Sequence, residues 1–318
     1  MKCGYLNKSA GDSFAVIPKI RVADFSLLFM KYEGIYFMKK TLIALAVAAS
    51  AVSGMAHAWE SGDFNGTVDI GGSIDATNYR QKWEWEVGTG LNGFSNTLSE
   101  LTDNDTKLII TVTGNKPILL GRTKEAFSAP VEGVGAIPQI AFTDYKGVPV
   151  EFKNPAGETN KGLAYLVLPM KNADGTEVGS LRVNATYAGV AADSEALVFA
   201  SIFAVNTNHI FNGGMPKNVS GAEFNKGSDA AALTALFGSL SESDLLEQIR
   251  KVDPSVGSFS DLGATVAANM VIADRSKVVS AAYALGIADG QTIEATFNQA
   301  VTTSTQWSAP LNVAITYY

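Results

Sequence analysis

The sequence predicts an all-β sandwich that carries a small helical insertion. Apolar and polar residues alternate with a period of two over short runs along most of the chain. Turn residues separate several of these runs, as at Asp174–Gly175 and Asp289–Gly290. Helical patterns do not alternate with the strands but are confined to one stretch, at about residues 189–275. Many short strands without alternating helices are typical of a sandwich.

The predicted strands each rest on such a run, and they follow one another along the chain at residues 64–74, 83–87, 108–113, 137–142, 163–168, 181–187, 278–285, 292–297 and 311–317. The first of them is the longest and the most regular. In the second, Trp83, Trp85 and Val87 alternate with two glutamates. The third is weaker because Ile109 interrupts the alternation.

Two helices are predicted within the insertion. An Ala-rich segment opens at Ser228 and ends at Phe237. Ser241 and Asp244 have the spacing of a capping box at the start of a second amphipathic helix, and Asp253–Pro254 ends that helix. Helices attached to a β scaffold are common places for binding specificity, because the scaffold holds them rigidly.

The first 58 residues contain an export signal. Met38 is followed by two lysines, by an apolar stretch at 42–52 and by small residues at Ala56 and Ala58. This order is that of a secretory signal peptide, and the apolar stretch is too short to span a bilayer. We therefore expect a signal peptide at residues 38–58 that is cleaved after Ala58.

Residues 1–37 precede this signal. The codons for Glu33–Gly34 can form a purine-rich string of the kind that a bacterial ribosome binds, and three residues separate it from Met38. We expect translation to start at Met38 and residues 1–37 to be upstream sequence read in error. N-terminal sequencing of the precursor tests this expectation.

Composition excludes several classes of function. Seven of the 24 basic and three of the 31 acidic residues lie in residues 1–58, which leaves 17 and 28 and a net charge of −11. Such an acidic chain is not expected to bind nucleic acid. Cys3, the only cysteine, also lies in this leader, so disulfides and thiol chemistry are excluded from the exported chain.

No enzyme motif is supported. The glycines from Gly88 to Gly93 match G-x-G-x-x-G, but the segment that follows is short and polar instead of helical, so we interpret them as a turn. Nucleophile-elbow, zinc-protease, P-loop and EF-hand patterns are absent, and His209 is the one histidine after the leader. We therefore expect no catalytic residue, no metal site and no cofactor.

The two ends of the exported chain are both amphipathic strands without protection. Exposed strand edges recruit other strands unless charge, proline or a bulge prevents it. If the sandwich lacks one of its own strands, the first strand of a neighbouring copy can complete it, with Phe64, Val68, Ile70 and Ile74 in pockets and Gly66 where the groove narrows. Such a contact is heterologous and propagates into a filament. The alternative is that residues 64–74 form an ordinary strand of their own domain.

Six stretches of the chain resemble a known family, and they lie at residues 59–74, 79–94, 111–127, 137–145, 158–172 and 278–318. The first reads WESGDFNGTVDIGGSI. Together they are similar to the FaeG/ClpG-like major fimbrial subunits and adhesins, which form the chaperone-usher fimbriae of enterotoxigenic enteric bacteria.

This resemblance implies an incomplete immunoglobulin-like sandwich at residues 77–318, completed by donor-strand exchange with the segment 59–76 of another copy. The implied partners are identical subunits, a periplasmic chaperone, an outer-membrane usher and host glycoprotein or glycolipid glycans. The subunit would pass through the periplasm to the cell surface. The chaperone would hold the C-terminal strand, at Leu311, Val313, Ile315 and Tyr317.

Between residues 189 and 275 the resemblance is reduced to islands such as Phe237–Leu240, and this is where the family places its sugar-binding region. Sugar sites combine amide or hydroxyl hydrogen bonds with an aromatic face. On that ground the candidate receptor-binding residues are Asn206, Asn208, His209, Phe211, Lys217, Phe224 and Asn225. Each is equally compatible with loop polarity or a core aromatic. The alternative function is a secreted β-sandwich enzyme that acts on polysaccharide.

Overall fold

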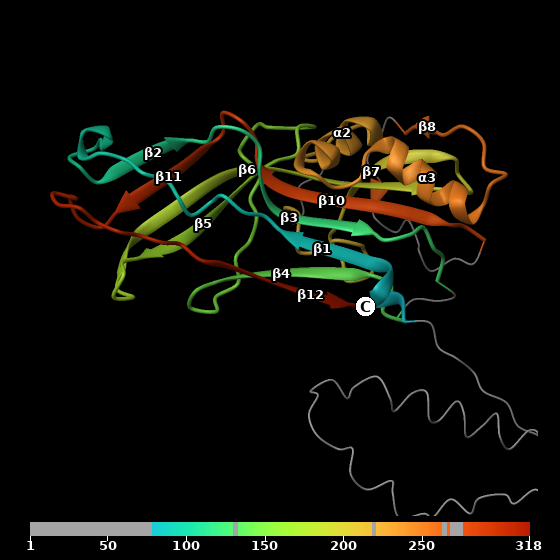
Figure 1. Ribbon diagram of the computed structural model, residues 1–318, viewed down its shortest axis with the longest axis horizontal. Helices are drawn as coiled ribbons and strands as arrows, with labels where there is room; N and C mark the ends of the chain where they lie inside the picture. Colours follow the sequence, from blue (N-terminus) through green and yellow to red (C-terminus); the bar gives the residue numbers. More distant parts are fainter. Residues whose placement is uncertain (1–77, 130–132, 218–220, 263–265, 268–275) are drawn as a thin grey trace, which may run out of the picture. The chain divides into compact units, whose positions relative to one another are not determined.

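The computed structural model describes residues 78–129, 133–217, 221–262, 266–267 and 276–318 (Figure 1). The predicted signal peptide and the predicted donor strand lie outside the described residues. Within the described part of the chain, no helix is long and apolar enough to cross a membrane.

The described residues form two sheets and two α-helices. The larger sheet contains β1 (Trp83–Val87), β2 (Lys107–Thr111), β3 (Lys116–Thr123), β5 (Leu163–Lys171), β6 (Glu177–Asp193), β7 (Val198–Phe203), β8 (Ser260–Asp261), β9 (Val266–Ala267), β10 (Val279–Ile287) and β11 (Thr292–Phe297). The smaller sheet pairs β4 (Pro138–Asp144) with β12 (Leu311–Tyr317). The helices are α2 (Gly227–Phe237) and α3 (Glu242–Val252), with short 3-10 turns η1 (Tyr79–Lys82) and η2 (Leu98–Glu100).

The long strand β6 organises the larger sheet. Along one edge it pairs with β10 and then with β11, and along the other edge with β7 and then with β5. Strand β3 pairs with β10, and β1 pairs with β3, so β1 is an edge strand of this sheet. All of these pairings are antiparallel, whereas the short strands β8 and β9 pair with β7 in parallel.

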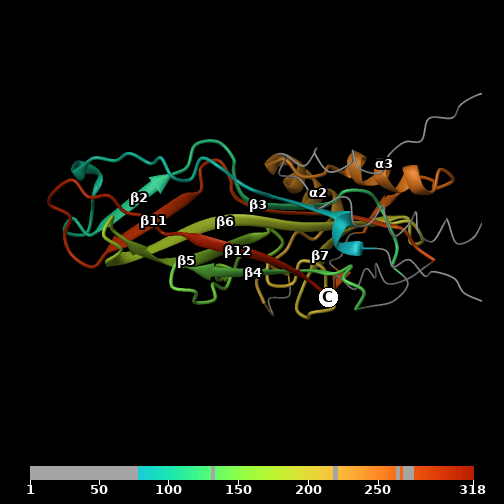
Figure 2. The same cartoon turned by 60° about the horizontal axis from the view of Figure 1, so that its bottom comes forward.

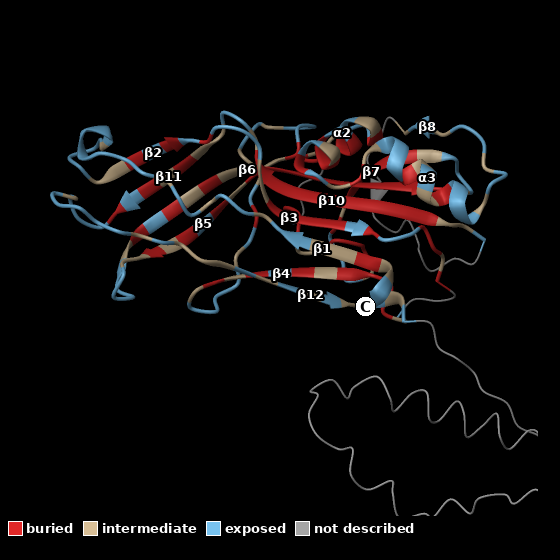
Figure 3. Ribbon diagram, viewed as in Figure 1, coloured by how far each residue is buried: buried red, intermediate tan, exposed pale blue. Residues whose placement is uncertain are grey.

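The two helices and the smaller sheet cover opposite faces of the larger sheet (Figure 2). Strand β10 lies between these layers and is buried along its whole length (Figure 3). Odd-numbered residues of β10 such as Tyr283 and Leu285 belong to the main core, whereas the even-numbered Ala282 and Ala284 belong to the core under the helices. Small side chains on that second face let α2 and α3 pack close to the sheet.

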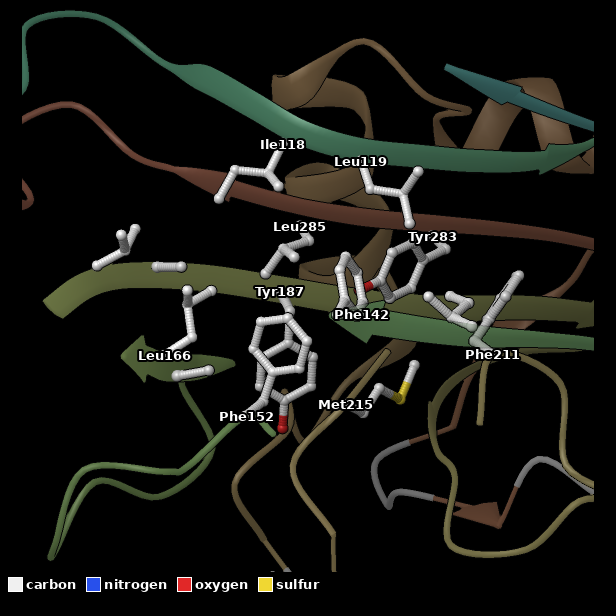
Figure 4. Close-up of a cluster of buried hydrophobic side chains, with 14 of the residues drawn as sticks. Ile118, Leu119, Phe142, Phe152, Leu166, Tyr187, Phe211, Met215, Tyr283 and Leu285 are labelled. Carbon is white, nitrogen blue, oxygen red and sulfur yellow. The ribbon is translucent and has the colours of Figure 1, made fainter. Parts of the chain in front are cut away.

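Aromatic and aliphatic side chains together fill the main core between the two sheets (Figure 4). The rings of Phe142 and Phe152 meet edge to face, with their centroids 4.9 Å apart. The hydroxyl of the fully buried Tyr283 donates a hydrogen bond to the carbonyl of Gly214 at 2.6 Å, because a buried hydroxyl needs a partner. This bond ties the loop that follows β7 to the centre of the sheet.

The structure confirms the predicted fold class, an all-β fold with a small helical insertion. Seven predicted strands appear as β1, β2, β4, β5, β10, β11 and β12, and the eighth is part of β6. Strands β3 and β7 were not predicted, and β6 continues to Asp193, inside the region expected to be helical. Both β7 and this part of β6 are largely buried on both faces, so they show no alternation of apolar and polar residues.

The capping box of α3 is confirmed. Ser241 Oγ accepts a hydrogen bond from the Asp244 backbone N–H at 3.2 Å, and an Asp244 carboxylate oxygen accepts one from Ser241 N–H at 2.9 Å. The start predicted for α2 is one residue late, because α2 begins at Gly227. A Cβ at Gly227 would lie 2.4 Å from the carbonyl of Phe199, so glycine is required where this helix meets β7.

Candidate functional site: an open strand edge beside an apolar groove

Within the described part of the chain, strand β12 is hydrogen-bonded along one of its two edges, the edge that faces β4. Ile137 N–H donates to the carbonyl of Tyr318 at 3.1 Å, and Tyr318 N–H donates to the carbonyl of Ile137 at 2.9 Å. Even-numbered residues of β12 are therefore the ones whose backbone groups face β4. In an antiparallel pair only every second residue bonds to its partner strand. The residues with backbone N–H and C=O groups on the opposite edge are therefore Leu311, Val313, Ile315 and Tyr317. Among the described residues, these backbone groups have no hydrogen-bond partner.

The side chains of the same four residues pack against the main core. All four are half-buried, whereas the residues between them are exposed. Each of the four thus offers an apolar side chain to the core and unpaired backbone groups to the open edge. An edge of this kind is a template for another strand.

Strand β1 also has an open edge. Gly88, which continues the register of β1 by one residue, donates its N–H to the carbonyl of Ile118 at 3.1 Å. Even-numbered residues of β1 therefore make the backbone hydrogen bonds with β3. Trp83, Trp85 and Val87 therefore present their backbone groups to the other edge. The Trp83 N–H donates to the carbonyl of Arg80 in the preceding turn, but the described residues supply no partner for the backbone groups of Trp85 and Val87. Val87 lies on the same face of β1 as Trp83 and Trp85, which pack against the main core, yet its side chain is 64% exposed.

An apolar groove lies between the end of β1 and β12. Its volume is about 210 Å³, and its rims include Val87, Leu311 and Val313. The floor comes from β5, β6 and β11 and includes Leu166 and Ile293. The groove continues into a second hollow of about 670 Å³, and the residues that line both are Leu91, Leu181, Ile293 and Ala309. An open strand edge and an apolar groove that leads into a more polar hollow therefore occur side by side.

One hydrogen bond connects β1 and β12. Trp85 Nε1 donates to the hydroxyl oxygen of Tyr317 at 3.0 Å. Burial raises the pKa of Tyr317 above its ordinary value, so the phenol stays neutral at physiological pH. The sequence shows the apolar rows of both strands, but that these rows face a common groove depends on how the two sheets pack.

The seven candidate receptor-binding residues do not form one cluster. Phe211 is completely buried and His209 is 3% exposed, so neither presents its ring to solvent. Phe224 is half-buried and packs against the core under the helices, next to Gly162. Asn206 and Asn225 are exposed, while Asn208 is half-buried and its side-chain oxygen finds no hydrogen-bond partner among the residues that the structure describes. Lys217 is exposed and forms an ion pair with Glu151.

The neutral imidazole of His209 fixes the loop that follows β7. Its Nδ1 accepts a hydrogen bond from the backbone N–H of Val205 at 3.1 Å, and burial lowers the pKa of His209 below its ordinary value. Its backbone carbonyl accepts a bond from the Gln139 side chain at 3.1 Å, which links the loop to β4. Protonation of Nδ1 would remove the acceptor and place a charge in a desolvated position.

We therefore expect acid to destabilise the subunit through His209. Between its lowered folded pKa and the unfolded value of about 6.5, the unfolded chain binds more protons, so stability falls as pH falls through this window, by up to about tenfold in the unfolding constant per pH unit. Above about pH 6.5 this contribution is constant. Denaturant unfolding of His209→Asn, which keeps an acceptor near the Nδ1 position, should show a weaker acid dependence than the wild-type protein. Identical pH profiles would contradict this role.

The fold and the groove define a class of protein: a β-sandwich subunit with an edge open to a further strand. The comparison with known proteins is specific. The sequence matches the family described as "Fimbrial, major and minor subunit" over residues 38–318, and the chain belongs to that family. It is a fimbrial subunit that is exported to the cell surface.

Known relatives agree with this assignment. The chain is 66% identical over 289 residues to the K88 fimbrial protein AD of Escherichia coli, and 66% identical over 289 residues to the K88 fimbrial protein AB of the same species. It is 29% identical over 294 residues to the F41 fimbrial protein of Escherichia coli. Each comparison covers 88% of this chain and all of the relative. These relatives are fimbrial proteins and not enzymes, so the alternative of a polysaccharide-degrading enzyme is set aside.

Proposed function

We propose that this subunit polymerises by donor-strand complementation and that the resulting fimbria attaches to host carbohydrate. The observation that carries the first part is the open edge of β12 beside an apolar groove. A strand placed there would pair with four residues whose backbone groups have no partner among the described residues. It would also cover the half-buried side chains of the same residues.

The donor in this proposal is the segment 59–76 of a neighbouring copy. Its apolar residues Phe64, Val68, Ile70 and Ile74 share one parity, as a strand with one face in a groove requires. Gly66 would pass where the groove is narrow. Donor and acceptor are different surfaces, so the subunits join head to tail. The finished filament then has one open groove at one end and one free donor segment at the other.

The open edge of β12 must be protected from other strands before the subunit is assembled into a fimbria. An unpaired strand beside an apolar groove is an aggregation hazard. We propose that a periplasmic chaperone pairs with Leu311, Val313, Ile315 and Tyr317 until an outer-membrane usher exchanges it for the donor segment. Translation from Met38 and cleavage after Ala58, which would place the donor at the new N-terminus, remain predictions.

Deleting residues 59–74 behind an intact signal peptide tests the proposal. We expect no fimbriae by electron microscopy, together with a folded, protease-resistant subunit bound to the chaperone in the periplasm. The deletion removes the donor but leaves the groove unchanged. Fimbriae of normal length from the deleted chain would show that another segment makes the joint.

Carbohydrate attachment is the second part of the proposal. The resemblance to fimbrial adhesins supports it, and the ligands in view are glycans of host glycoproteins or glycolipids. Wild-type fimbriae applied to a glycan array should bind a defined set of sugars. Fimbriae that bind no sugar on the array would reduce the subunit to a structural role.

A further inference from the structure

We propose that Asn92–Gly93 is a site of spontaneous deamidation, at which the Asn92 side chain is converted into a carboxylate beside the apolar groove. An asparagine that precedes glycine is prone to this reaction, because glycine has no Cβ to hinder the approach of its own backbone nitrogen. The chain contains three such pairs, which begin at Asn65, Asn92 and Asn212, and the last two lie in the described residues. The surroundings of these two differ, and the difference selects Asn92.

The reaction needs only the chain itself and water. The backbone nitrogen of Gly93 loses its proton and attacks Cγ of the Asn92 side chain, and the side-chain nitrogen leaves with that proton as ammonia. The new N–Cγ bond closes a five-membered succinimide ring. Water then breaks one of the two C–N bonds of this imide, which gives aspartate or isoaspartate at position 92. Each product carries a negative charge that asparagine lacks.

Asn92 is not held in place by the described part of the structure. Residues 88–97, which follow β1, form no helix or strand (Figure 1). Asn92 and Gly93 are both exposed, and neither makes a hydrogen bond to another described residue. A Cβ added to Gly93 would meet nothing within 4 Å, so the backbone has space to turn. The Gly93 nitrogen can therefore lose its proton to solvent and reach the Asn92 side chain.

Asn212 also precedes a glycine, but the fold holds it. Its side-chain amide donates to Gln139 Oε1 at 2.8 Å, and its backbone carbonyl accepts a bond from Ile140 N–H at 2.8 Å. A Cβ on Gly213 would lie 2.0 Å from the Ile140 carbonyl oxygen, so the backbone is tightly packed there. Asn212 must leave these contacts before the ring can close, and a site that needs local opening reacts slowly.

The position of Asn92 gives the modification a consequence. Asn92 lies on the wall of the hollow that continues the apolar groove, and all residues that line this hollow are uncharged. A carboxylate at position 92 would be the first charge on that wall. The segment 59–76, the proposed donor, has no basic side chain. Its carboxylates belong to Glu60, Asp63, Asp69 and Asp75.

The new charge would therefore repel the donor. Carboxylates lie toward both ends of the segment 59–76, so the repulsion does not depend on the direction that the donor takes in the groove. A deamidated subunit would accept a donor more slowly than a fresh one. This consequence rests on the donor-strand complementation proposed above, whereas the deamidation itself does not.

Peptide mapping by mass spectrometry tests the modification on purified subunit that is incubated at body temperature. Trypsin places Asn92 and Asn212 on different peptides, residues 83–107 and 183–217. We expect conversion of Asn92 to exceed that of Asn212 by about tenfold or more. The rate at Asn92 should rise by up to about tenfold per pH unit, because the reactive amide is the deprotonated one.

The matched variant is Gly93→Ala, whose Cβ has space in the folded chain. It should leave the subunit folded and slow the conversion of Asn92 severalfold, because the added methyl group hinders ring closure. An Asn92 that stays intact, or equal conversion of Asn92 and Asn212, would overturn the proposed site.

A synthetic peptide of residues 59–76 tests the consequence. At low ionic strength it should bind the Asn92→Asp subunit severalfold more slowly than the wild-type subunit, and salt should reduce the difference, because a charge at the rim of a binding surface acts mainly on the association rate. The control is Asn225→Asp, which adds the same charge at an exposed position that lines neither the groove nor the hollow. It should bind as the wild type does.

The two parts of the proposal fail in different ways. Equal association rates for Asn92→Asp and wild type at low ionic strength would refute the effect of the charge on the donor. A peptide that binds neither subunit would contradict donor-strand complementation, and the peptide map would still decide whether Asn92 is modified.

Discussion

Replacing Val313 by proline is expected to abolish fimbriae while the subunit remains folded. The N–H of Val313 points to the open edge of β12 and has no partner among the described residues, so its loss costs the subunit no hydrogen bond. Proline is tolerated in an edge strand when its missing N–H faces outward. In the filament the same change would leave a donor-strand carbonyl buried without a partner, at a cost of about 1–3 kcal/mol.

That cost applies at every joint of the filament. Each 1.4 kcal/mol weakens one joint about tenfold, and the proline ring also occupies space that the incoming strand needs. The chaperone proposed for this edge would be affected in the same way. Electron microscopy should therefore show bare cells, while protease resistance and thermal unfolding of the periplasmic subunit should stay close to wild type.

The neighbouring position provides the control. The N–H of Ala314 faces β4 in the antiparallel register, so Ala314→Pro breaks a bond inside the subunit and should lower its stability. Val313→Ala, which shortens the side chain but keeps the N–H, separates the packing contribution from the hydrogen bond. Normal fimbriae from Val313→Pro would mean that β12 is not the acceptor edge.

Most of the strands that sequence alone predicts have one face that is more exposed than the other; β10, which is buried on both faces, is an exception. Strands β11 and β12 have the predicted limits, since a more exposed residue alternates with a more buried one along each of them. Strand β7 is buried on both sides and shows no such period. The location of the groove was also beyond prediction, because its rims at Val87 and Leu311 are far apart in the sequence and meet only when the two sheets pack.

The receptor-binding candidates show a similar limit. They were chosen by residue type within one loop region, and residue type does not reveal burial. Of the seven, His209 and Phe211 are buried, whereas Asn206, Lys217 and Asn225 are exposed.

Phe211→Ala is expected to destabilise the subunit by about 3–5 kcal/mol, the usual cost of removing a buried phenylalanine ring. Phe211 is fully buried, and its ring meets Trp83 edge to face at 5.5 Å and Tyr283 at 5.3 Å. Its φ is +63°, a conformation that non-glycine residues seldom adopt, so the chain accepts backbone strain to place the ring there. Denaturant unfolding of the purified subunit measures the loss.

This expectation separates a core role from a receptor role. A surface aromatic that stacked on a sugar would lose binding on truncation while stability stayed the same, whereas a core aromatic loses stability first. Because folded proteins are stable by only about 5–15 kcal/mol, a loss of this size should reduce the amount of subunit that reaches the surface. Fimbriae that do form should bind as well per subunit as wild type, since the ring of Phe211 is fully buried and does not reach the surface. Wild-type stability combined with lost binding would return Phe211 to the receptor site.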